Sequence, residues 1–211
     1  MLTKNIFRTE IREVLLEQMV SGNIRPGDRI SLPTLAKQLA VSVTPVREAL
    51  TQLTETGIVT YIANRGFFAT ELTEKEAIDV YEVITLLECE AIRKTAFSAQ
   101  HLAALEAINE KFRLAKQPVD RLKLDMDFHR KLTENCGNQY VLKIVEDIRV
   151  RIYIYEHAFM SSEPVEDSAN MHQRIIEGLR SSDLDLAVGE LTANWQISIK
   201  HILLFYHSKA T

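Results

Sequence analysis

The sequence contains few of the residues that disulfide-rich or many-stranded proteins need. Its 211 residues include two cysteines, seven glycines, five prolines and one tryptophan. Cys89 and Cys136 lie far apart and outside any Cys-x-x-Cys pair, so nothing indicates a disulfide scaffold or a zinc knuckle. The scarcity of glycine and proline disfavours a fold with many tight turns. The composition therefore predicts a mainly helical globular protein whose two thiols are reduced and buried.

The sequence also lacks a long hydrophobic run. No segment approaches the roughly 18 apolar residues of a membrane-spanning helix. Lys4, Arg8 and Glu10 interrupt the N-terminal segment, where a signal peptide would be apolar. We therefore expect a soluble, cytoplasmic protein with no membrane partner.

The charge is negative overall but unevenly distributed. The net charge is −4, with 8 Lys and Arg against 6 Asp and Glu (+2) in residues 1–70 and 17 against 23 (−6) in residues 71–211. The negative total disfavours a wholly basic nucleic-acid coat and leaves the N-terminal third as the more cationic part.

The first seventy residues have the pattern of a winged helix-turn-helix. Apolar periodicity predicts helices at residues 4–20, 32–39 and 44–53. β-branched and aromatic residues predict strands at residues 58–62 and 67–70, on either side of a turn at Asn64-Arg65-Gly66. Three helices followed by a β-hairpin are the elements of this fold.

No strand pattern appears after Thr73. Thr73 and Glu76 form a capping box that opens a long helix. Five further helices are predicted at residues 99–115, 118–136, 138–159, 167–181 and 184–207. The fold class is therefore mainly α: a winged domain (1–70), a linker (71–75) and an all-helical domain (76–211).

The second short helix of the winged domain has the residues of a DNA-reading helix. Ser42 and Thr44 lie at its N-terminus, where short hydroxyls can bind phosphate oxygens. Arg47 lies one turn later, where a guanidinium can bond guanine O6 and N7. Taken singly, each of these residues is more typical of an ordinary solvated helix surface, where arginine is common.

The predicted wing carries a further cation. Arg65 at the hairpin tip can lie along a minor groove, while Asn64 and Gly66 accommodate the turn. A turn arginine with no DNA role is the alternative interpretation.

The order of these segments resembles the GntR family of bacterial transcription regulators. The strings PGDRI, LAKQLAVSVTPVREALTQLTETGIV and NRG occur in one register across residues 10–70. Two departures are present: Val43 stands where the family usually has arginine, and Leu32-Pro33-Thr34 replaces a polar stretch. The resemblance implies operator binding through Thr44, Arg47 and the wing, with weaker affinity or a different operator.

The helical part contains a candidate metal site. Asp125 and His129 are four residues apart and project from one helical face, so a carboxylate and an imidazole can converge on a cation. The spacing alone also fits an exposed Asp–His pair.

The string from Asp125 to Leu132, followed by Gly137-Asn138, resembles the FCD ligand-binding domain of the FadR subfamily. That resemblance implies His172 as a third metal ligand. It places a fourth ligand 22 residues after His172, where this chain has Asn194 instead of histidine. An amide oxygen is a harder, weaker donor than imidazole, which lowers affinity for Zn²⁺ or Ni²⁺ and leaves Mn²⁺, or no metal, as alternatives.

The same resemblance implies a small organic acid as effector in the bundle core. Arg151 stands where the family often has an inner arginine, and Arg149 and Tyr153 share its segment. Ile84 replaces another common arginine, so one carboxylate anchor is missing. Surface ion pairs and partly buried rings are the alternative interpretation of this segment.

These observations predict a DNA-binding transcription regulator, a repressor acting as a homodimer on a pseudo-palindromic operator and switched by a small effector. We do not expect an enzyme. A metal-dependent enzyme built on Asp125, His129 and His172 is an alternative, although no nucleophile, P-loop or dinucleotide motif accompanies them. A winged domain that binds proteins is the other alternative.

Overall fold

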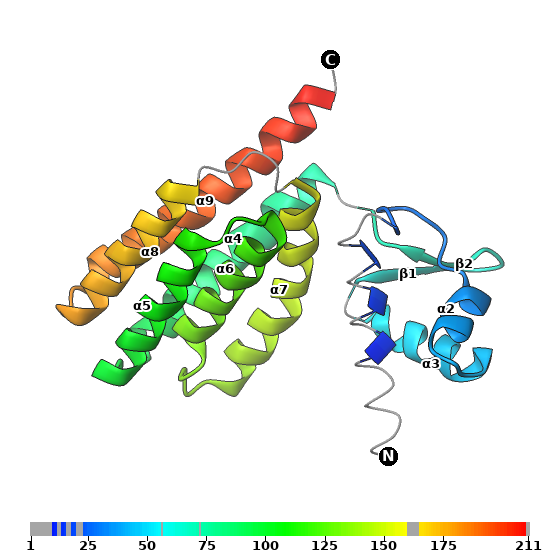
Figure 1. Ribbon diagram of the computed structural model, residues 1–211, viewed down its shortest axis with the longest axis horizontal. Helices are drawn as coiled ribbons and strands as arrows, with labels where there is room; N and C mark the ends of the chain where they lie inside the picture. Colours follow the sequence, from blue (N-terminus) through cyan, green and yellow to red (C-terminus); the bar gives the residue numbers. More distant parts are fainter. Residues whose placement is uncertain are drawn as a thin grey trace. The chain divides into compact units, whose positions relative to one another are not determined.

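The structure is a computed structural model that describes residues 10, 11, 14, 15, 18, 19, 23–55, 57–71, 73–159 and 165–209 (Figure 1). The chain divides into two compact units, Met1–Leu72 and Thr73–Thr211. Most of the helix predicted at residues 4–20 lies outside the described residues. Its described residues Ile11 and Leu15 are helical and fully buried, as the apolar spacing predicts.

The first unit contains two short helices, α2 (Leu32–Gln38) and α3 (Val43–Leu53). The Ser31 hydroxyl caps α2 by accepting a hydrogen bond from the backbone N–H of Thr34, at 3.3 Å. Both helices turn their apolar faces into one core, to which they contribute Leu35, Ala36, Val46, Ala49, Leu50 and Leu53. The opposite face of α3 is thereby left to solvent.

A hairpin completes this unit. Strands β1 (Val59–Ile62) and β2 (Gly66–Ala69) pair antiparallel, with Val59 opposite Ala69 and Ile62 opposite Gly66. The connection needs left-handed backbone at Asn64 (φ 62°) and Gly66 (φ 100°), which asparagine and glycine tolerate best. A third extended segment joins through a bridge from Arg29 to Phe68. The predicted winged helix-turn-helix hairpin is confirmed, with Gly66 as the first residue of β2.

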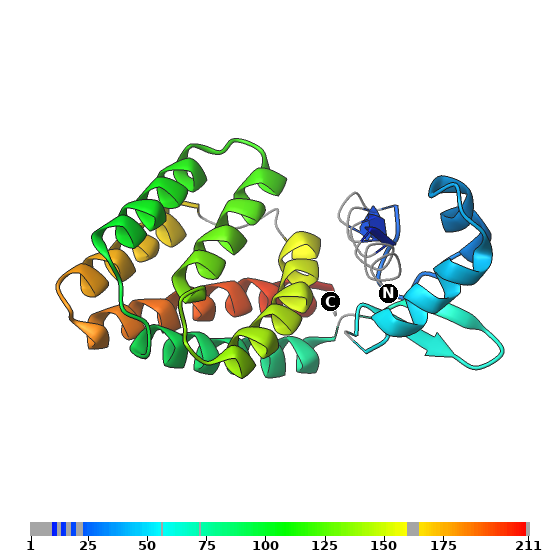
Figure 2. The same ribbon diagram turned by 90° about the horizontal axis from the view of Figure 1, so that it is seen from below.

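Six helices form the second unit: α4 (Glu74–Arg93), α5 (Ala99–Leu114), α6 (Pro118–Thr133), α7 (Gln139–Phe159), α8 (Val165–Arg180) and α9 (Leu184–Lys209). They pack as a closed ring in the order α4, α7, α6, α5, α8, α9 and back to α4 (Figures 1 and 2). The mainly helical fold is therefore as predicted. The α6 helix ends three residues earlier than predicted, and α8 begins two residues earlier.

Local capping sets where several of these helices begin. The Thr73 hydroxyl accepts the backbone N–H of Glu76 at 3.2 Å and starts α4, so α4 begins inside the predicted linker. The Ser98 hydroxyl accepts the N–H of His101 at 3.1 Å and starts α5. Pro118 at the first turn of α6 lacks the N–H that a helix start would leave unpaired. Among the described residues, none of the helices combines the length and hydrophobicity that crossing a membrane would require.

Candidate functional site

The face of α3 that carries Thr44 and Arg47 is open to solvent. Ser42 occupies the N-cap position, but its side chain forms no capping hydrogen bond, so its hydroxyl remains available to an external acceptor or donor. Thr44 and Arg47 are exposed on the same part of the helix, away from buried Val46 and Leu50. The structure therefore places the three predicted DNA-reading residues of α3 together on one solvent-facing surface.

Val43 belongs to this surface as well. Its side chain is 37% exposed at the first turn of α3. An exposed valine between two hydroxyl residues offers a DNA base only an apolar contact, such as one with a thymine methyl group.

The wing presents Asn64 and Arg65 to solvent at the end of the hairpin. The Arg65 guanidinium lies 5.2 Å from the centre of the Phe68 ring, which supports the side chain from one side. Gly66 has the positive φ that the turn requires, so a side chain there would be strained. The hairpin thus holds Arg65 at an exposed tip, as a minor-groove contact would require.

A buried polar cluster occupies the interior of the helical ring. Each of the six helices contributes at least one side chain to it: Glu88 (α4), Asn109 (α5), Asp125 and His129 (α6), Arg149 (α7), His172 (α8), and Asn194 and Trp195 (α9). All except Asp125 are buried. Burying so many polar groups is costly unless they pair, and the ring closes around their mutual hydrogen bonds.

The predicted metal ligands Asp125, His129 and His172 converge at this point. Their ligand atoms all lie within 4.8 Å of one another. His172 Nε2 is 3.4 Å from Asp125 Oδ1, and His129 Nε2 is 4.0 Å from Asp125 Oδ2. Asn194 Oδ1 is 3.1 Å from His129 Nε2, so the fourth predicted residue is also at the site. Atoms that share one Zn²⁺-sized cation lie roughly 3 to 4 Å apart, so these separations fit a cation with little rearrangement.

The Nδ1 atoms of both histidines are fixed by hydrogen-bond partners, so Nε2 is the atom of each ring that would bind a cation. His129 Nδ1 faces Glu88 Oε2 at 2.8 Å, and His172 Nδ1 faces Asn109 Oδ1 at 3.2 Å. The amide of Asn109 is itself fixed because its Nδ2 donates to the Ala169 carbonyl at 3.0 Å. A nitrogen that faces an oxygen acceptor carries a proton, which leaves the Nε2 lone pair of His172 directed at the site. His129 Nε2 itself faces an acceptor, Asn194 Oδ1, and can bind a cation only after it loses its proton. His172 Nε2 is buried and has no hydrogen-bond partner among the described residues, as a ligand atom awaiting a cation would be.

Electrostatics distinguish the two imidazoles. Burial lowers the pKa of His129, but the carboxylates of Glu88 and Asp125 outweigh burial and raise this pKa above its ordinary value. Burial lowers the pKa of His172 well below its ordinary value, and the charge on His129 lowers it further. His172 is therefore neutral near pH 7, whereas the raised pKa of His129 favours its protonated form. A cation that binds the Nε2 atoms of both histidines must displace the proton on His129 Nε2.

Glu88 holds this arrangement together. Its Oε1 accepts from Arg149 Nε (3.2 Å) and Nη2 (2.7 Å), and its Oε2 accepts from His129 Nδ1 and from Trp195 Nε1 (3.0 Å). Burial raises the pKa of Glu88, but the charges of His129 and Arg149 outweigh this and lower it below its ordinary value. The carboxylate is thus ionised and accepts hydrogen bonds on both oxygens.

The predicted effector residues lie in three different settings. The Arg149 guanidinium is buried, and besides Glu88 it binds Glu146 Oε1 (2.6 Å), Thr133 Oγ1 (2.6 Å) and the His129 carbonyl (2.7 Å). Arg151 pairs with Glu76 near the start of α4, and Tyr153 is half-buried on α7. Glu76 precedes Glu88 by twelve residues, or about 18 Å of helix. The structure therefore joins Arg149 to the metal ligands and leaves Arg151 at the other end of α4.

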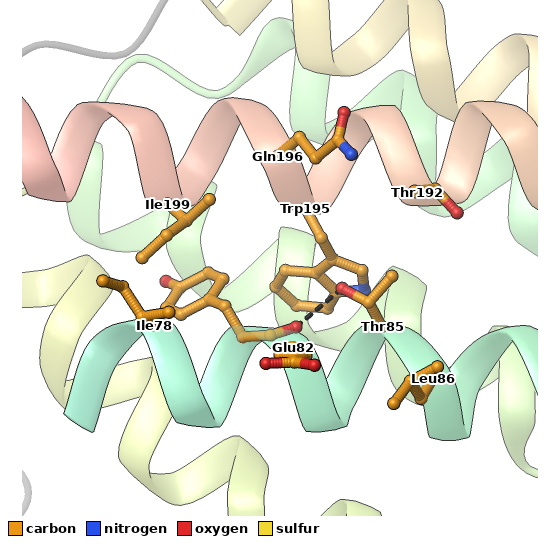
Figure 3. A pocket seen from close by; sticks show the side chains of 9 residues that line it. Ile78, Glu82, Thr85, Leu86, Thr192, Trp195, Gln196 and Ile199 are labelled. Atoms are coloured by element: carbon orange, nitrogen blue, oxygen red, sulfur yellow. Dashed lines mark hydrogen bonds between the residues drawn. The ribbon is translucent and has the colours of Figure 1, made fainter. Parts of the chain in front are cut away.

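An apolar groove lies between α4 and α9 (Figure 3). Its volume is about 290 Å³, and its lining comprises Ile78, Tyr81, Glu82, Thr85, Leu86, Thr192, Trp195, Gln196 and Ile199. The centres of the Trp195 and His129 rings lie 4.2 Å apart, so the indole contacts both the groove and one predicted metal ligand.

Sequence reasoning missed Glu88 and Asn109, which orient the two histidines. For Glu88 a signal was present: the residue lies one turn from both Ile84 and Ile92 on the buried stripe of α4, where a charge is unusual. Asn109 gave no comparable signal, because only the packing of α5 against α8 places it beside His172.

A winged helix-turn-helix unit with an exposed helix and wing, followed by a helical unit around a buried polar cluster, is the architecture of a class of transcription regulators. Residues 7–69 match the family described as "Bacterial regulatory proteins, gntR family", and residues 79–196 match the FCD domain. The chain belongs to the GntR family and carries an FCD domain.

Curated relatives agree with this assignment. The chain is 37% identical over 157 residues to the "Nta operon transcriptional regulator" of Aminobacter aminovorans, covering 72% of this chain and 75% of that protein. It is 24% identical over 187 residues to the "HTH-type transcriptional repressor GlaR" of Escherichia coli, covering 80% and 83% of the two chains. Both names are those of transcriptional regulators, the class that the family match also gives, and not of enzymes.

Solved structures agree at the level of the fold. The structure of E. coli McbR/YncC superposes with a TM-score of 0.82 at 22% identity, covering 95% of this chain and 98% of that one. A putative GntR regulator from Rhodococcus sp. RHA1 superposes with a TM-score of 0.79 at 20% identity, covering 93% and 97%.

Proposed function

We propose that this protein is a metal-dependent transcriptional repressor of the FadR subfamily, which binds its operator as a homodimer in the cytoplasm. A small organic acid, bound at a divalent cation in the helical ring, changes its operator affinity. The observation that carries the proposal is the convergence of Asp125, His129 and His172 in a bundle that follows an exposed recognition helix.

The cation would be held by Asp125, His129, His172 and the amide oxygen of Asn194. When bound, it would supply a Lewis-acid centre with positions open to a carboxylate or hydroxyl of the effector. A set of two imidazoles and two oxygens suits Mn²⁺, Zn²⁺ or Ni²⁺, and the amide oxygen weakens preference for the softer ions. Glu88 and Asn109 would orient the imidazoles from behind.

Calorimetric titration of chelator-treated protein with Mn²⁺, Zn²⁺ and Ni²⁺ tests the metal centre. We expect one bound cation per chain and loss of binding in His172→Gln. Arg174→Gln, an exposed residue on the same helix, is the matched control and should bind as the wild type does. Wild-type protein that binds none of the three cations would refute the metal centre.

Operator binding is supported by the solvent-facing residues of α3 and by the Arg65 wing. In a homodimer, two such surfaces related by a twofold axis require a pseudo-palindromic site. Sites selected from random duplex DNA by the wild-type protein should therefore contain two inverted half-sites. An Arg47→Ala variant should lose about 1–3 kcal/mol of binding free energy if Arg47 forms a bidentate contact with guanine.

Arg47→Lys is the matched control, because lysine keeps the positive charge but cannot form the bidentate hydrogen bonds of a guanidinium. It should retain the salt dependence of binding and lose discrimination at one base pair. Unchanged binding by Arg47→Ala would refute the assigned role. Binding without sequence preference or salt dependence would instead favour a winged domain that contacts proteins.

A further inference from the structure

The first turn of α4 is fastened to α7 by a polar cluster, which we call the clasp: Thr73, Glu76, Arg151 and Tyr155. Tyr155 is buried, Glu76 and Arg151 are half-buried, and Thr73 is exposed. The fully buried Tyr155 hydroxyl accepts the backbone N–H of Thr73 at 3.1 Å. It lies 2.9 Å from the Thr73 carbonyl and 3.0 Å from Glu76 Oε2, to either of which it can donate. Arg151 pairs with Oε1 of the same Glu76. The clasp therefore holds Thr73, the first residue of the helical unit, which follows Leu72 at the end of the winged unit.

The same helix, α7, reaches the metal ligands at Arg149. Its guanidinium binds Glu88, whose other oxygen holds His129 Nδ1, and it also binds the His129 backbone carbonyl. Arg149 and Tyr155 are six residues apart, or about 9 Å along the helix axis. One rigid helix thus contacts a predicted metal ligand through Arg149 and the first turn of α4 through Tyr155 and Arg151.

Both ends of this connection are buried, which makes it sensitive to small displacements. Few waters can replace a lost partner of Tyr155 or Arg149, so a shift of α7 must either keep these hydrogen bonds or leave polar groups unpaired. A packed helix that contacts both sites is the kind of element that can carry coupling between them.

We propose that α7 transmits occupancy of the metal centre to the first turn of α4, with Arg151 and Tyr155 as positioning residues that set the start of this helix. This inference rests on the proposed function, because it needs a cation that binds His129. It also gives Arg151 a role different from the effector ligand that the sequence suggested, since the carboxylate it binds is that of Glu76.

The test uses the full chain, metal alone as the probe, and two conservative variants. Tyr155→Phe removes only the hydroxyl of the clasp. Tyr140→Phe, at an exposed position on the same helix and outside the clasp, is the matched control. Metal affinity is measured by calorimetry, and affinity for the selected operator is measured with and without metal.

In the wild type we expect metal to change operator affinity by at least about fivefold. Tyr155→Phe should bind metal within about threefold of the wild type, yet show a metal-dependent change in operator affinity below twofold. Tyr140→Phe should keep the full change. A Tyr155→Phe variant with the full wild-type change would overturn the clasp.

Hydrogen exchange of the wild type provides a measurement that does not depend on a variant. Metal should alter exchange at the amides of residues 73–78 as well as near the ligands on α6 and α8. Changes at α6 and α8 without any at residues 73–78 would overturn the clasp and leave the metal centre standing. A wild type that binds no metal would overturn the proposed function, and the clasp with it.

Discussion

Replacing Glu88 by glutamine tests whether the buried charge network stabilises the helical unit. The carboxylate of Glu88 accepts hydrogen bonds from Arg149, His129 and Trp195 on its two oxygens. Glutamine has nearly the same shape but only one acceptor oxygen, so its NH₂ group must face one pair of these donors. It also removes the negative charge that compensates the buried Arg149 guanidinium.

The expected loss of stability is large because the site is enclosed. Removing one partner of a buried ion pair costs about 3–5 kcal/mol. For a unit of this size that corresponds to a decrease of roughly 10 °C or more in melting temperature. Scanning calorimetry in the presence of a chelator should detect this shift in the transition of the helical unit.

Glu82→Gln is the matched control, because Glu82 is exposed on the same helix and has no ion pair among the described residues. It should leave the transition unchanged. A Glu88→Gln transition within 2 °C of the wild type would refute the reasoning, because it would mean that Arg149 and His129 find other partners at little cost.

Four further predictions concern packing, pH, metal and DNA. Gly178→Ala should destabilise the helical unit by about 1–3 kcal/mol in chemical denaturation, since the added methyl would lie 2.8 Å from backbone of α9. Gly189→Ala, with nothing within 4 Å, should instead stabilise it by about 0.5–1 kcal/mol. Burial lowers the pKa of His172, so only the unfolded chain protonates this imidazole as pH falls below 6.5. The free energy of unfolding of metal-free protein should therefore decrease as pH falls through this range. His172→Gln should make this decrease with pH less steep. Asn194→His should raise Zn²⁺ affinity by more than about tenfold in competition titrations, and an unchanged affinity would place residue 194 outside the coordination sphere. Val43→Arg should tighten operator binding and increase the magnitude of its salt-dependence slope by about 1, because it adds a cation to the exposed start of α3; binding that weakens or stays constant would show that this surface does not face DNA.

Local sequence determined the elements and the class of the protein. Periodicity, the Thr73 cap and the turn residues Asn64 and Gly66 predicted nearly every described helix and the hairpin, because these signals act within a few residues of the chain. The spacing of Asp125 and His129 placed both on one face of α6, because helical geometry alone fixes that relation.

The tertiary structure decided which distant residues meet, and the sequence predicted this for His172 and Asn194 only through the family resemblance. His172 and Asn194 reach His129 because the six helices close into a ring, and Glu88 becomes the orienting carboxylate because the same closure buries it against Arg149. Side-chain pairing across helices depends on their mutual packing, which no local periodicity encodes. For the same reason Arg149 and Arg151, two residues apart in one helix, serve different sites: one is buried among the metal ligands, and the other fastens the start of α4.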